Sequence, residues 1–431
     1  MTPILIILAG GASSRMWPIR EKSLMRFGTD PLLLAQLRTY QSLGFSEAVI
    51  VGNPHNKADM QQIMDSIKDE MTLHLAIQES PIGMGDAVLR AAEKLADKRD
   101  SAIYITQVHD VVEEKFHTDM LKMYRSNPET TYLAGIEMDE YFPGGYLIVD
   151  ETGMISGIIE KPGADKRPSN LVNIVAHMHS NAGKLFDAIQ AEYDNEIESD
   201  DHYERAMDVL MKQQPYRVVP YNGRWDALKY PWHMLDIMDS FLQRIKGQTV
   251  SPTAFVADTA SLVGDVYIGE NVKIFPGAAV VGPAYIGDGT IIGNNALVRQ
   301  SMVLQDCEVG FTTEVARSYV AENCSMHACR VLDSVFAAGV NFSAGCTTAN
   351  LRIDKGDVPT MIKGDKMSSG RDKFGAVIGE GAFIGVDVMT MPGTKIGTEA
   401  QIGPGTHVIK DVKDETRVYV RQELLVVENK S

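Results

Sequence analysis

The segment VYIGENVKIFPGAAVVGPAYIGDGTIIGNNALV, residues 266–298, decides the fold of the second half of the chain. An aliphatic residue returns every six positions, and a glycine often follows it, as at Ile268-Gly269 and Ile286-Gly287. The repeat positions are Leu262, Ile268, Ile274, Val280, Ile286, Ile292, Val298 and Leu304. This period is typical of a hexapeptide β-solenoid, whose coils each turn three aliphatic side chains inward. An ordinary β-sandwich would alternate with a period of two.

The same rhythm continues outward from this segment toward the C-terminus. It slips near Gly310, returns at Ile378-Gly379 and runs to Val408. Residues 351–372 break the repeat with charged residues and glycines, so we expect them to loop out of the stack. We therefore expect a β-helix domain over residues 249–415 and a C-terminal tail over residues 416–431.

The first half of the chain, residues 1–248, alternates short apolar runs with helical patterns. The predicted strands are Ile4–Ala9, Glu47–Val51, Leu73–Ile77 and Ala102–Thr106. The predicted helices are Leu32–Leu43, Ala58–Ile67 and Asp86–Leu95, with a closing helix at Pro231–Arg244 before a linker at 246–248. This α/β alternation predicts a Rossmann-like domain with a mainly parallel sheet covered by helices on both faces.

Composition excludes several classes of function. The chain has 431 residues and a formal charge of −16, which disfavours a nucleic-acid binder because phosphate backbones need a basic surface. No apolar run near the N-terminus is long enough to span a membrane, and no basic stretch precedes one. The four cysteines form no Cys-x-x-Cys pair, which favours reduced thiols in a cytoplasmic protein. A metal site at Cys324 and Cys329 lacks a second ligand pair.

A small-residue turn, Ala9-Gly10-Gly11-Ala12-Ser13-Ser14-Arg15, leaves the first predicted strand at its carboxyl end. Parallel sheets bind ligands at this edge, and glycines let backbone N–H groups approach a polyphosphate. Arg15 offers a forked cationic contact to phosphate oxygens, and Lys22 adds a point charge. The spacing is neither a Walker loop nor a dinucleotide fingerprint.

The run Leu8-Ala9-Gly10-Gly11-x-x-Ser14-Arg15-Met16-x-Pro18, followed by Lys22, resembles the signature loop of the sugar-1-phosphate nucleotidylyltransferases. The resemblance covers nearly the whole chain and implies that Arg15 and Lys22 are catalytic cations holding a triphosphate. It implies nucleotide binding by Leu8, Ala9, Gly10, Gly11, Gln78 and Gly83. The Gln78 amide offers one donor and one acceptor, which suits uracil or thymine and favours UTP or dTTP.

Further motifs extend this resemblance to the sugar phosphate and to the metal. The resemblance implies sugar-phosphate binding by Gly145, Glu160, Lys161 and Asn173, and Mg²⁺ binding by Asp110 and Asp226. It implies one displacement at the α-phosphorus that releases pyrophosphate. Three departures leave the sugar and the base open: Glu21 precedes Lys22, Asp30 replaces a lysine, and Val108-His109 precede Asp110.

The β-helix half resembles the acetyltransferase half of the archaeal bifunctional amino-sugar-1-phosphate enzymes. The resemblance rests on residues 325–334, 340–352 and 369–373, and implies left-handed coils and acetyl-CoA as co-substrate. It implies that His327 is the general base for the sugar amino group, since an imidazole suits proton transfer near neutral pH. It offers Arg317, Asn350, Lys355 and Lys373 as further acetyltransferase residues. Arg330 and Cys346 depart from the family pattern.

Three functions stay open from the sequence. The first is a bifunctional enzyme that makes a nucleotide-activated N-acetyl amino sugar. The second is a monofunctional UDP-, dTDP- or GDP-hexose pyrophosphorylase with a structural or regulatory β-helix. The third is a scaffolding protein with a degenerate transferase fold, which the joint presence of Arg15, Lys22, Asp110, Lys161 and Asp226 disfavours. The family resemblance also implies a homo-oligomer, a trimer formed through the β-helix.

Overall fold

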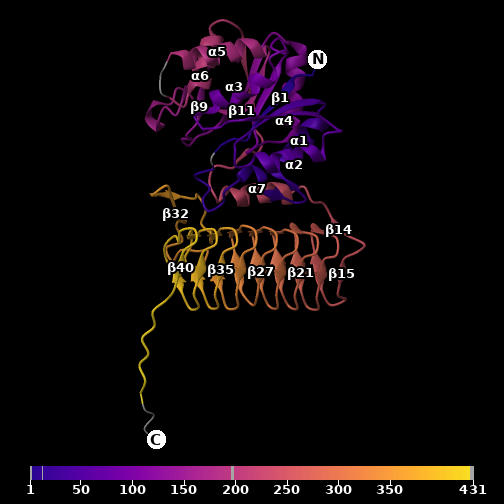
Figure 1. Ribbon diagram of the computed structural model, residues 1–431, viewed down its shortest axis with the longest axis vertical. Coiled ribbons are helices and arrows are strands. Elements are labelled where there is room, and N and C mark those ends of the chain that lie inside the picture. Colours follow the sequence, from indigo (N-terminus) through magenta and orange to yellow (C-terminus); the bar gives the residue numbers. More distant parts are fainter. Residues whose placement is uncertain (1, 12, 196–198, 428–431) are drawn as a thin grey trace. The chain divides into compact units, whose positions relative to one another are not determined.

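The computed structural model describes residues 2–11, 13–195 and 199–427, and the chain divides into two compact units (Figure 1). The first unit comprises Met1–Ala12, Ser23–Met25 and Pro31–Ala227. The second comprises Ser13–Lys22, Arg26–Asp30 and Leu228–Ser431. Ala12, in the predicted phosphate loop, lies outside the described residues. Among the helices of the described ranges, none is long and apolar enough to cross a membrane.

The first unit is built on a nine-stranded sheet with the order β10-β9-β11-β6-β1-β4-β5, in which β8 also pairs with β11, and β12 pairs with β8. Its strands are β1 (Ile4–Leu8), β4 (Glu47–Gly52), β5 (Thr72–Ile77), β6 (Ile103–Gln107), β8 (Thr131–Glu137), β9 (Gly145–Val149), β10 (Ile155–Glu160), β11 (Leu171–His179) and β12 (Tyr216–Pro220). The four predicted strands β5, β4, β1 and β6 run parallel, whereas β11 runs antiparallel to β6, β8 and β9. The predicted Rossmann-like sheet is thus confirmed.

Helices of the first unit bury their apolar stripes against this sheet. They are α1 (Leu32–Ser42), α2 (Lys57–Ser66), α3 (Met84–Lys94), α4 (Glu114–Ser126), α5 (Ala182–Asp194) and α6 (His202–Met211), with a 3-10 turn η2 (Ala164–Lys166). Val88 of α3, Leu185 of α5 and Met207 of α6 join one fully buried cluster with Ile6 and Ile105 of the central strands. Burial of such side chains stabilises each by roughly 1.5–3 kcal/mol, so this cluster anchors the three helices. A separate ribbon pairs β7 (Asp110–Val111) with β13 (Asp226–Ala227).

The second unit is a parallel β-helix of three ladders, visible as stacked coils in Figure 1. The first ladder is β14 (Gln248–Val250), β17 (Val266–Ile268), β20 (Ala284–Ile286), β23 (Met302–Val303), β26 (Tyr319–Val320), β29 (Val335–Phe336), β34 (Val377–Ile378) and β37 (Lys395–Ile396). The second is β15 (Phe255–Val256), β18 (Lys273–Ile274), β21 (Ile291–Ile292), β24 (Glu308–Val309), β27 (Ser325–Met326), β30 (Asn341–Phe342), β35 (Phe383–Ile384), β38 (Gln401–Ile402) and β40 (Arg417–Val418). The third is β16 (Ser261–Val263), β19 (Ala279–Val281), β22 (Leu297–Arg299), β25 (Glu314–Ala316), β28 (Arg330–Leu332), β31 (Thr347–Thr348), β36 (Met389–Thr390) and β39 (His407–Val408). The predicted left-handed β-helix is confirmed at the level of fold.

The inward side chains correct one detail of the predicted repeat. Successive partners lie 18 residues apart at Ile268 and Ile286, but 17 apart at Ile286 and Val303. Val303, and not Leu304, therefore continues the column, and the slip is a shortened corner within an unbroken stack. A buried serine at each such corner donates its hydroxyl to the carbonyl two residues earlier. These serines are Ser301, Ser318 and Ser334, at 2.8, 2.9 and 2.7 Å.

The predicted excursion leaves the stack as expected. Phe336 pairs directly with Ile378, so the ladder closes across the intervening residues. Within them, β32 (Pro359–Ile362) and β33 (Asp365–Ser368) form a hairpin, and Leu351 bridges Lys373 at its base. The second unit also holds α7 (His233–Leu242) and β2 (Arg26–Phe27). The turn η1 (Lys22–Leu24) and the strand β3 (Asp30–Pro31), which pairs with β2, each have residues in both units. The four cysteines are buried free thiols.

Candidate active site

The turn after β1 is shaped by residues that the sequence analysis did not single out. The Asn53 side chain donates to the Gly10 carbonyl at 3.3 Å, and the Asn56 side chain donates to the Ala9 carbonyl at 3.1 Å. A Cβ on Gly10 would come within 2.9 Å of the Gly52 carbonyl, so only glycine fits there. Both asparagines follow β4 at the carboxyl edge of the sheet, which is the signal that points to them.

Gln78, the predicted base-reading residue, follows β5 at the same edge and is almost fully buried. Its Nε2 donates to the Gly83 carbonyl at 2.9 Å, while its Oε1 lies close to Gly10. Gly83 has φ +118°, which favours glycine, and this backbone lets the loop fold back over the amide. The structure thus brings together Gly10, Gln78 and Gly83 from three separate segments.

Three predicted sugar-binding residues, Glu160, Gly145 and Asn173, form one row across the sheet, which we call the sugar row. Glu160 of β10 lies opposite Gly145 of β9, and Val172 opposite Tyr146 places Asn173 of β11 on the other side of Gly145. Residues opposite each other point to the same face, so Glu160 and Asn173 flank a position without a side chain. The row offers a carboxylate acceptor at one end and an amide at the other, with a glycine gap between them.

Lys161 follows Glu160 in the chain and has a constrained backbone conformation. Its φ is +45°, which is rare for a residue with a side chain, and its N–H donates to the Gly144 carbonyl at 3.1 Å. Its Nζ lies 3.0 Å from Asp200 and 3.4 Å from Glu160. Partial burial opposes the charge, yet these bonds raise the pKa of Lys161 above its usual value. The ammonium is therefore held charged beside the row, where a phosphate group suits it.

A second carboxyl that the sequence analysis missed, Glu204 of α6, lies near Glu160. Burial, reinforced by the charge of Glu160, raises the pKa of Glu204 to about 8. This carboxyl therefore keeps its proton at neutral pH and adds no second negative charge beside Glu160. Only the fold reveals this pair, because α6 and β10 meet through tertiary packing.

The two predicted metal ligands lie on neighbouring strands but on opposite faces of their ribbon. Ala227 pairs with Asp110, and Asp226 pairs with Val111. Because side chains alternate along a strand, Ala227 shares the face of Asp110 and Asp226 takes the other. The hydrogen bonds agree, since Trp225 Nε1 donates to Asp110 at 3.2 Å while Arg224 Nε contacts both oxygens of Asp226 at 3.0 and 2.9 Å.

These positions bear directly on Mg²⁺ binding. Asp110 is a buried carboxylate at the carboxyl edge of the sheet and suits a hard cation. Asp226 is held by Arg224 on the opposite face. Across the described residues, His, Cys, Asp and Glu side chains form no group of three or more that could hold a metal. The two carboxylates take opposite faces of the ribbon, and a Mg²⁺ site that they share stays a prediction.

Arg15 and Lys22, the predicted catalytic cations, belong to the second unit. Arg15 is exposed, and Lys22 begins η1 with its Nζ donating to the Leu228 carbonyl at 3.2 Å. Between them, Trp17 Nε1 donates to Asp414 at 2.9 Å. The latter part of the predicted phosphate loop therefore packs on the β-helix.

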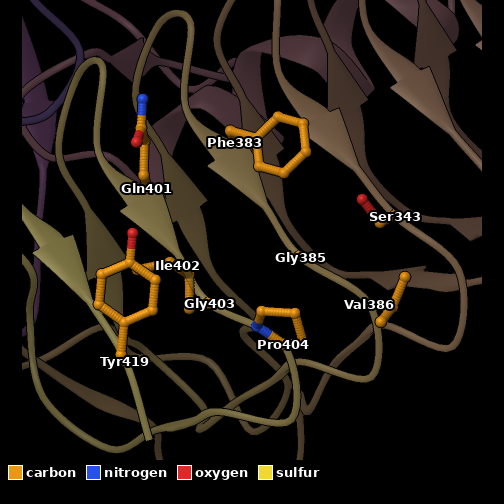
Figure 2. Close-up of a pocket in the computed structure, with 9 residues that line it drawn as sticks. All are labelled: Ser343, Phe383, Gly385, Val386, Gln401, Ile402, Gly403, Pro404 and Tyr419. Carbon is orange, nitrogen blue, oxygen red and sulfur yellow. The ribbon is translucent and has the colours of Figure 1, made fainter.

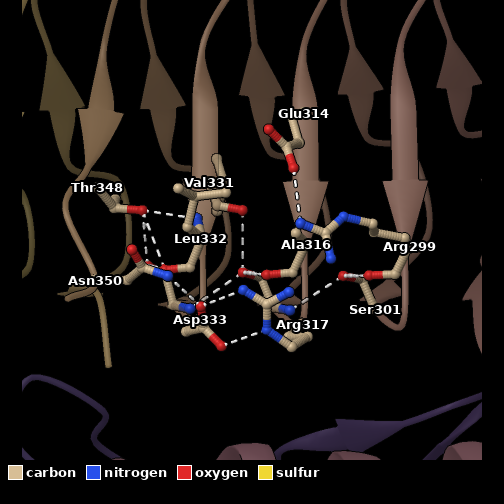
Figure 3. A network of polar contacts seen from close by, with 12 residues as sticks. Arg299, Ser301, Glu314, Ala316, Arg317, Val331, Leu332, Asp333, Thr348 and Asn350 are labelled. Atoms are coloured by element: carbon tan, nitrogen blue, oxygen red, sulfur yellow. Dashed lines mark hydrogen bonds and ion pairs between the residues drawn. The ribbon is translucent and has the colours of Figure 1, made fainter. Parts of the chain in front are cut away.

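The predicted acetyltransferase residues lie at two corners of the β-helix. His327 follows β27, at the corner between the second and third ladders. Arg317 and Asn350 lie at the corner after the third ladder, where both bind the buried Asp333 (Figure 3). Arg317 reaches both Asp333 oxygens at 2.7 Å, and this pairing raises the pKa of Arg317 further.

The two predicted lysines lie in or beside the excursion that begins at this second corner. Lys373 pairs with Leu351, the residue that follows Asn350 in the chain, and Lys355 is exposed in the excursion. Asp333 was missed by the sequence analysis, although its place three residues after Arg330 lies within the quoted motif. A single chain thus brings Arg317, Asn350 and Lys373 together but leaves His327 on another corner.

The residues that directly follow the strands of the second ladder form a column at one edge of the β-helix. On the C-terminal side of His327 this column contains a hollow. Ser343, Gly385, Gly403 and Tyr419 stand at successive turns, and the two glycines leave a gap between the serine and the tyrosine (Figure 2). Phe383, which is 50% exposed, flanks the gap. The hollow therefore offers an apolar surface along the same edge as His327.

Residues 4–226 match the nucleotidyl transferase family. The chain belongs to this family. Residues 245–354 of this nucleotidyl transferase match the GMPPB C-terminal domain. The prediction of a nucleotidyltransferase enzyme is confirmed by the first match.

Curated relatives resemble this nucleotidyl transferase over almost its entire length. A protein of Sulfurisphaera tokodaii named bifunctional sugar-1-phosphate nucleotidylyltransferase/acetyltransferase is 30% identical over 414 residues, which cover 94% of this chain and 97% of the relative. The bifunctional protein GlmU of Methanococcus vannielii is 28% identical, with 98% of each chain covered. A solved UDP-glucose pyrophosphorylase complexed with UDP-glucose covers 57% of this chain and all of its own, at 16% identity and a TM-score of 0.47, a likeness too weak to add to the assignment.

Proposed function

We propose that this nucleotidyl transferase joins a nucleoside triphosphate, UTP or dTTP, to a sugar 1-phosphate and releases pyrophosphate. The row Glu160–Gly145–Asn173, with the charged Lys161 beside it, is the observation that supports the sugar phosphate. A carboxylate accepts hydroxyl groups, an amide bonds a polar substituent, and an ammonium binds phosphate. The name of the Sulfurisphaera relative gives the same substrate class.

In this reaction most of the catalysis is positional and electrostatic, because two anions must meet. Gln78 and Gly83 orient the base, Lys161 holds the incoming phosphate, and Arg15 and Lys22 offset charge on the pyrophosphate. Asp110 is the residue that fits a Mg²⁺ ion, while Asp226 is bound to Arg224.

A pyrophosphate-release screen tests the proposal. It combines the four common triphosphates with several hexose and amino-sugar 1-phosphates, with Mg²⁺ and with EDTA. We expect release only with a pyrimidine triphosphate and a sugar 1-phosphate, and a fall of orders of magnitude in Lys22→Ala. Release that needs no sugar phosphate, or none with any pair, would overturn the proposal.

We propose acetyl transfer from acetyl-CoA to an amino-sugar 1-phosphate as a second function. The cluster of Arg317, Asp333 and Asn350 supports it, because a polar site so ordered is not needed for stacking alone. His327 lies on a different corner, so the complete site takes His327 from one copy and Asn350 from another. The trimer predicted from the sequence provides such a pairing.

Thiol release from acetyl-CoA with glucosamine or galactosamine 1-phosphate tests this second function. We expect release with one of them and loss of release in His327→Ala. No release with either sugar would leave the monofunctional hexose pyrophosphorylase as the better description. Cytoplasmic location remains a prediction.

A further inference from the structure

A line of buried side chains stands behind Asn173. Its members are His177, Tyr203 and His179, each at most 1% exposed. Asn173 Oδ1 lies 3.0 Å from His177 Nε2, His177 Nδ1 lies 2.8 Å from the Tyr203 hydroxyl, and that hydroxyl lies 3.0 Å from His179 Nε2. Three consecutive hydrogen bonds thus connect the sugar row to the interior.

Which atom donates in each of these hydrogen bonds follows from His179, the member of the line farthest from Asn173. Its Nδ1 is buried and has no hydrogen-bond partner within the described part of the chain. Burial lowers the pKa of both histidines, that of His177 to about 3, so both rings are neutral. A neutral ring has one N–H, and an orphaned buried donor is costly, so His179 carries its hydrogen on Nε2 and donates to Tyr203.

The remaining bonds follow from the number of hydrogens. The Tyr203 hydroxyl has one hydrogen, and since its oxygen accepts from His179 it donates to His177 Nδ1. His177 therefore carries its own hydrogen on Nε2 and donates to Asn173 Oδ1. The Asn173 carbonyl is thereby engaged, and the amide NH₂ is left for the side of the sugar row, beside Gly145.

We propose that Tyr203 and His177 are positioning residues that hold Asn173 as a hydrogen-bond donor toward the sugar row. A donor held at this position favours a sugar 1-phosphate that offers an acceptor there, and this preference is the readout of how the amide is held. This inference rests on the proposed function and adds two residues that position its sugar-binding amide. The row then has complementary ends, with an acceptor at Glu160 and a donor at Asn173.

Two variants test the selection by kcat/KM for N-acetylglucosamine 1-phosphate against glucosamine 1-phosphate. Wild-type protein should prefer the N-acetyl sugar. Asn173→Asp presents a carboxylate oxygen in place of the NH₂ and should invert the preference. Tyr203→Phe removes the hydrogen bond to His177, so that the Asn173 amide can rotate. It should lower the preference about tenfold by raising KM for the N-acetyl sugar without changing kcat, since one hydrogen bond contributes roughly 1.4 kcal/mol.

The matched control is Tyr216→Phe, a buried tyrosine whose ring lies 6.2 Å from that of His179 but which is outside the line of bonds. It should leave the preference unchanged. A Tyr203→Phe variant with a native circular dichroism spectrum and wild-type preference would overturn the proposal. So would an Asn173→Asp variant that still favours the N-acetyl sugar.

Nitrogen-15 NMR of the substrate-free protein separates this inference from the proposed function. We expect the Nε2–H tautomer at both His177 and His179, and a change at His177 in Tyr203→Phe. A Nδ1–H tautomer at His177 would overturn the inference whatever the activity. Turnover of neither sugar by a wild-type protein with the expected tautomers would overturn the proposed function and leave the fixed amide standing.

Discussion

The sheet of the first unit and the coils of the second assemble polar residues in opposite ways. In the sheet, strands far apart in the sequence become neighbours, so Glu160, Gly145 and Asn173 form one row within one chain. In the β-helix, each strand pairs with the equivalent strand of the next coil, so residues on different corners stay apart. His327 and Asn350 are closer in sequence than Gly145 and Asn173, yet they lie on different corners. The sugar-binding row therefore lies within one chain, whereas the acetyl-transfer site that we propose takes residues from two copies.

Removal of the Asp110 carboxylate should have the largest effect. Asp110→Asn should lower nucleotidyl transfer by about 10²–10³-fold, the usual cost of one preorganised charge in a reacting site. Asp226→Asn, the matched control on the other ribbon face, should cost less than about tenfold, because its carboxylate faces away from Asp110 and contacts Arg224. Steady-state pyrophosphate release measures both. Equal losses in the two variants would show that both carboxylates act at the reacting centre.

Mixing of inactive subunits should give the next largest effect. His327→Ala and Asn350→Ala should each abolish acetyl transfer, whereas co-refolded mixtures should regain about a quarter of wild-type activity, because random pairing joins an intact His327 to an intact Asn350 at that frequency. Asp110→Asn mixed with Glu160→Gln should regain no nucleotidyl transfer, since both residues belong to one unit. Recovery there, or none in the β-helix mixture, would contradict the comparison.

The two regions also differ in what their sequences predict. The six-residue period identifies inward side chains as far as Val298, because stacking on a neighbouring coil is a local rule. It fails at Val303, where a corner shortens around Ser301. In the first unit, motifs point to Glu160 and Asn173, but strand order and register decide that both flank Gly145.

Residues without a motif could not be found from the sequence. Glu204 and Tyr203 reach the row of Glu160, Gly145 and Asn173 only through packing of α6 on the sheet, and His177 reaches Asn173 across an irregularity in β11. Asp226 shows a second limit, because its motif could not predict which face of a two-residue strand the side chain takes. One position of register decides which face a strand residue takes.

Glu204 should make the stability of the first unit depend on pH. Its pKa of about 8 lies above the usual value near 4.3, so its contribution to stability is complete below about pH 4.3 and is lost as the pH rises through 8. Glu204→Gln should therefore raise stability at pH 9, by on the order of 2 kcal/mol after allowance for solvent screening, and change it little at pH 5. Urea unfolding at both pH values measures this. Exposed Glu151→Gln is the control, and an equal gain in both variants would contradict the assignment.

The smallest expected effect concerns Trp17, which belongs to the predicted phosphate loop but lies in the second unit with the β-helix. Trp17→Phe keeps a ring near Lys395 but removes the donor to Asp414, and it should destabilise the protein by about 1 kcal/mol, the net contribution of a typical hydrogen bond. Arg20→Gln removes a longer, exposed contact to the same carboxylate and should cost less than about 0.5 kcal/mol. Thermal unfolding measures both, and Asp414→Asn combined with Trp17→Phe should add little, because the two changes share one contact. Additive losses in the double variant would mean that Trp17 and Asp414 act independently, and that the loop is held to the β-helix by other residues.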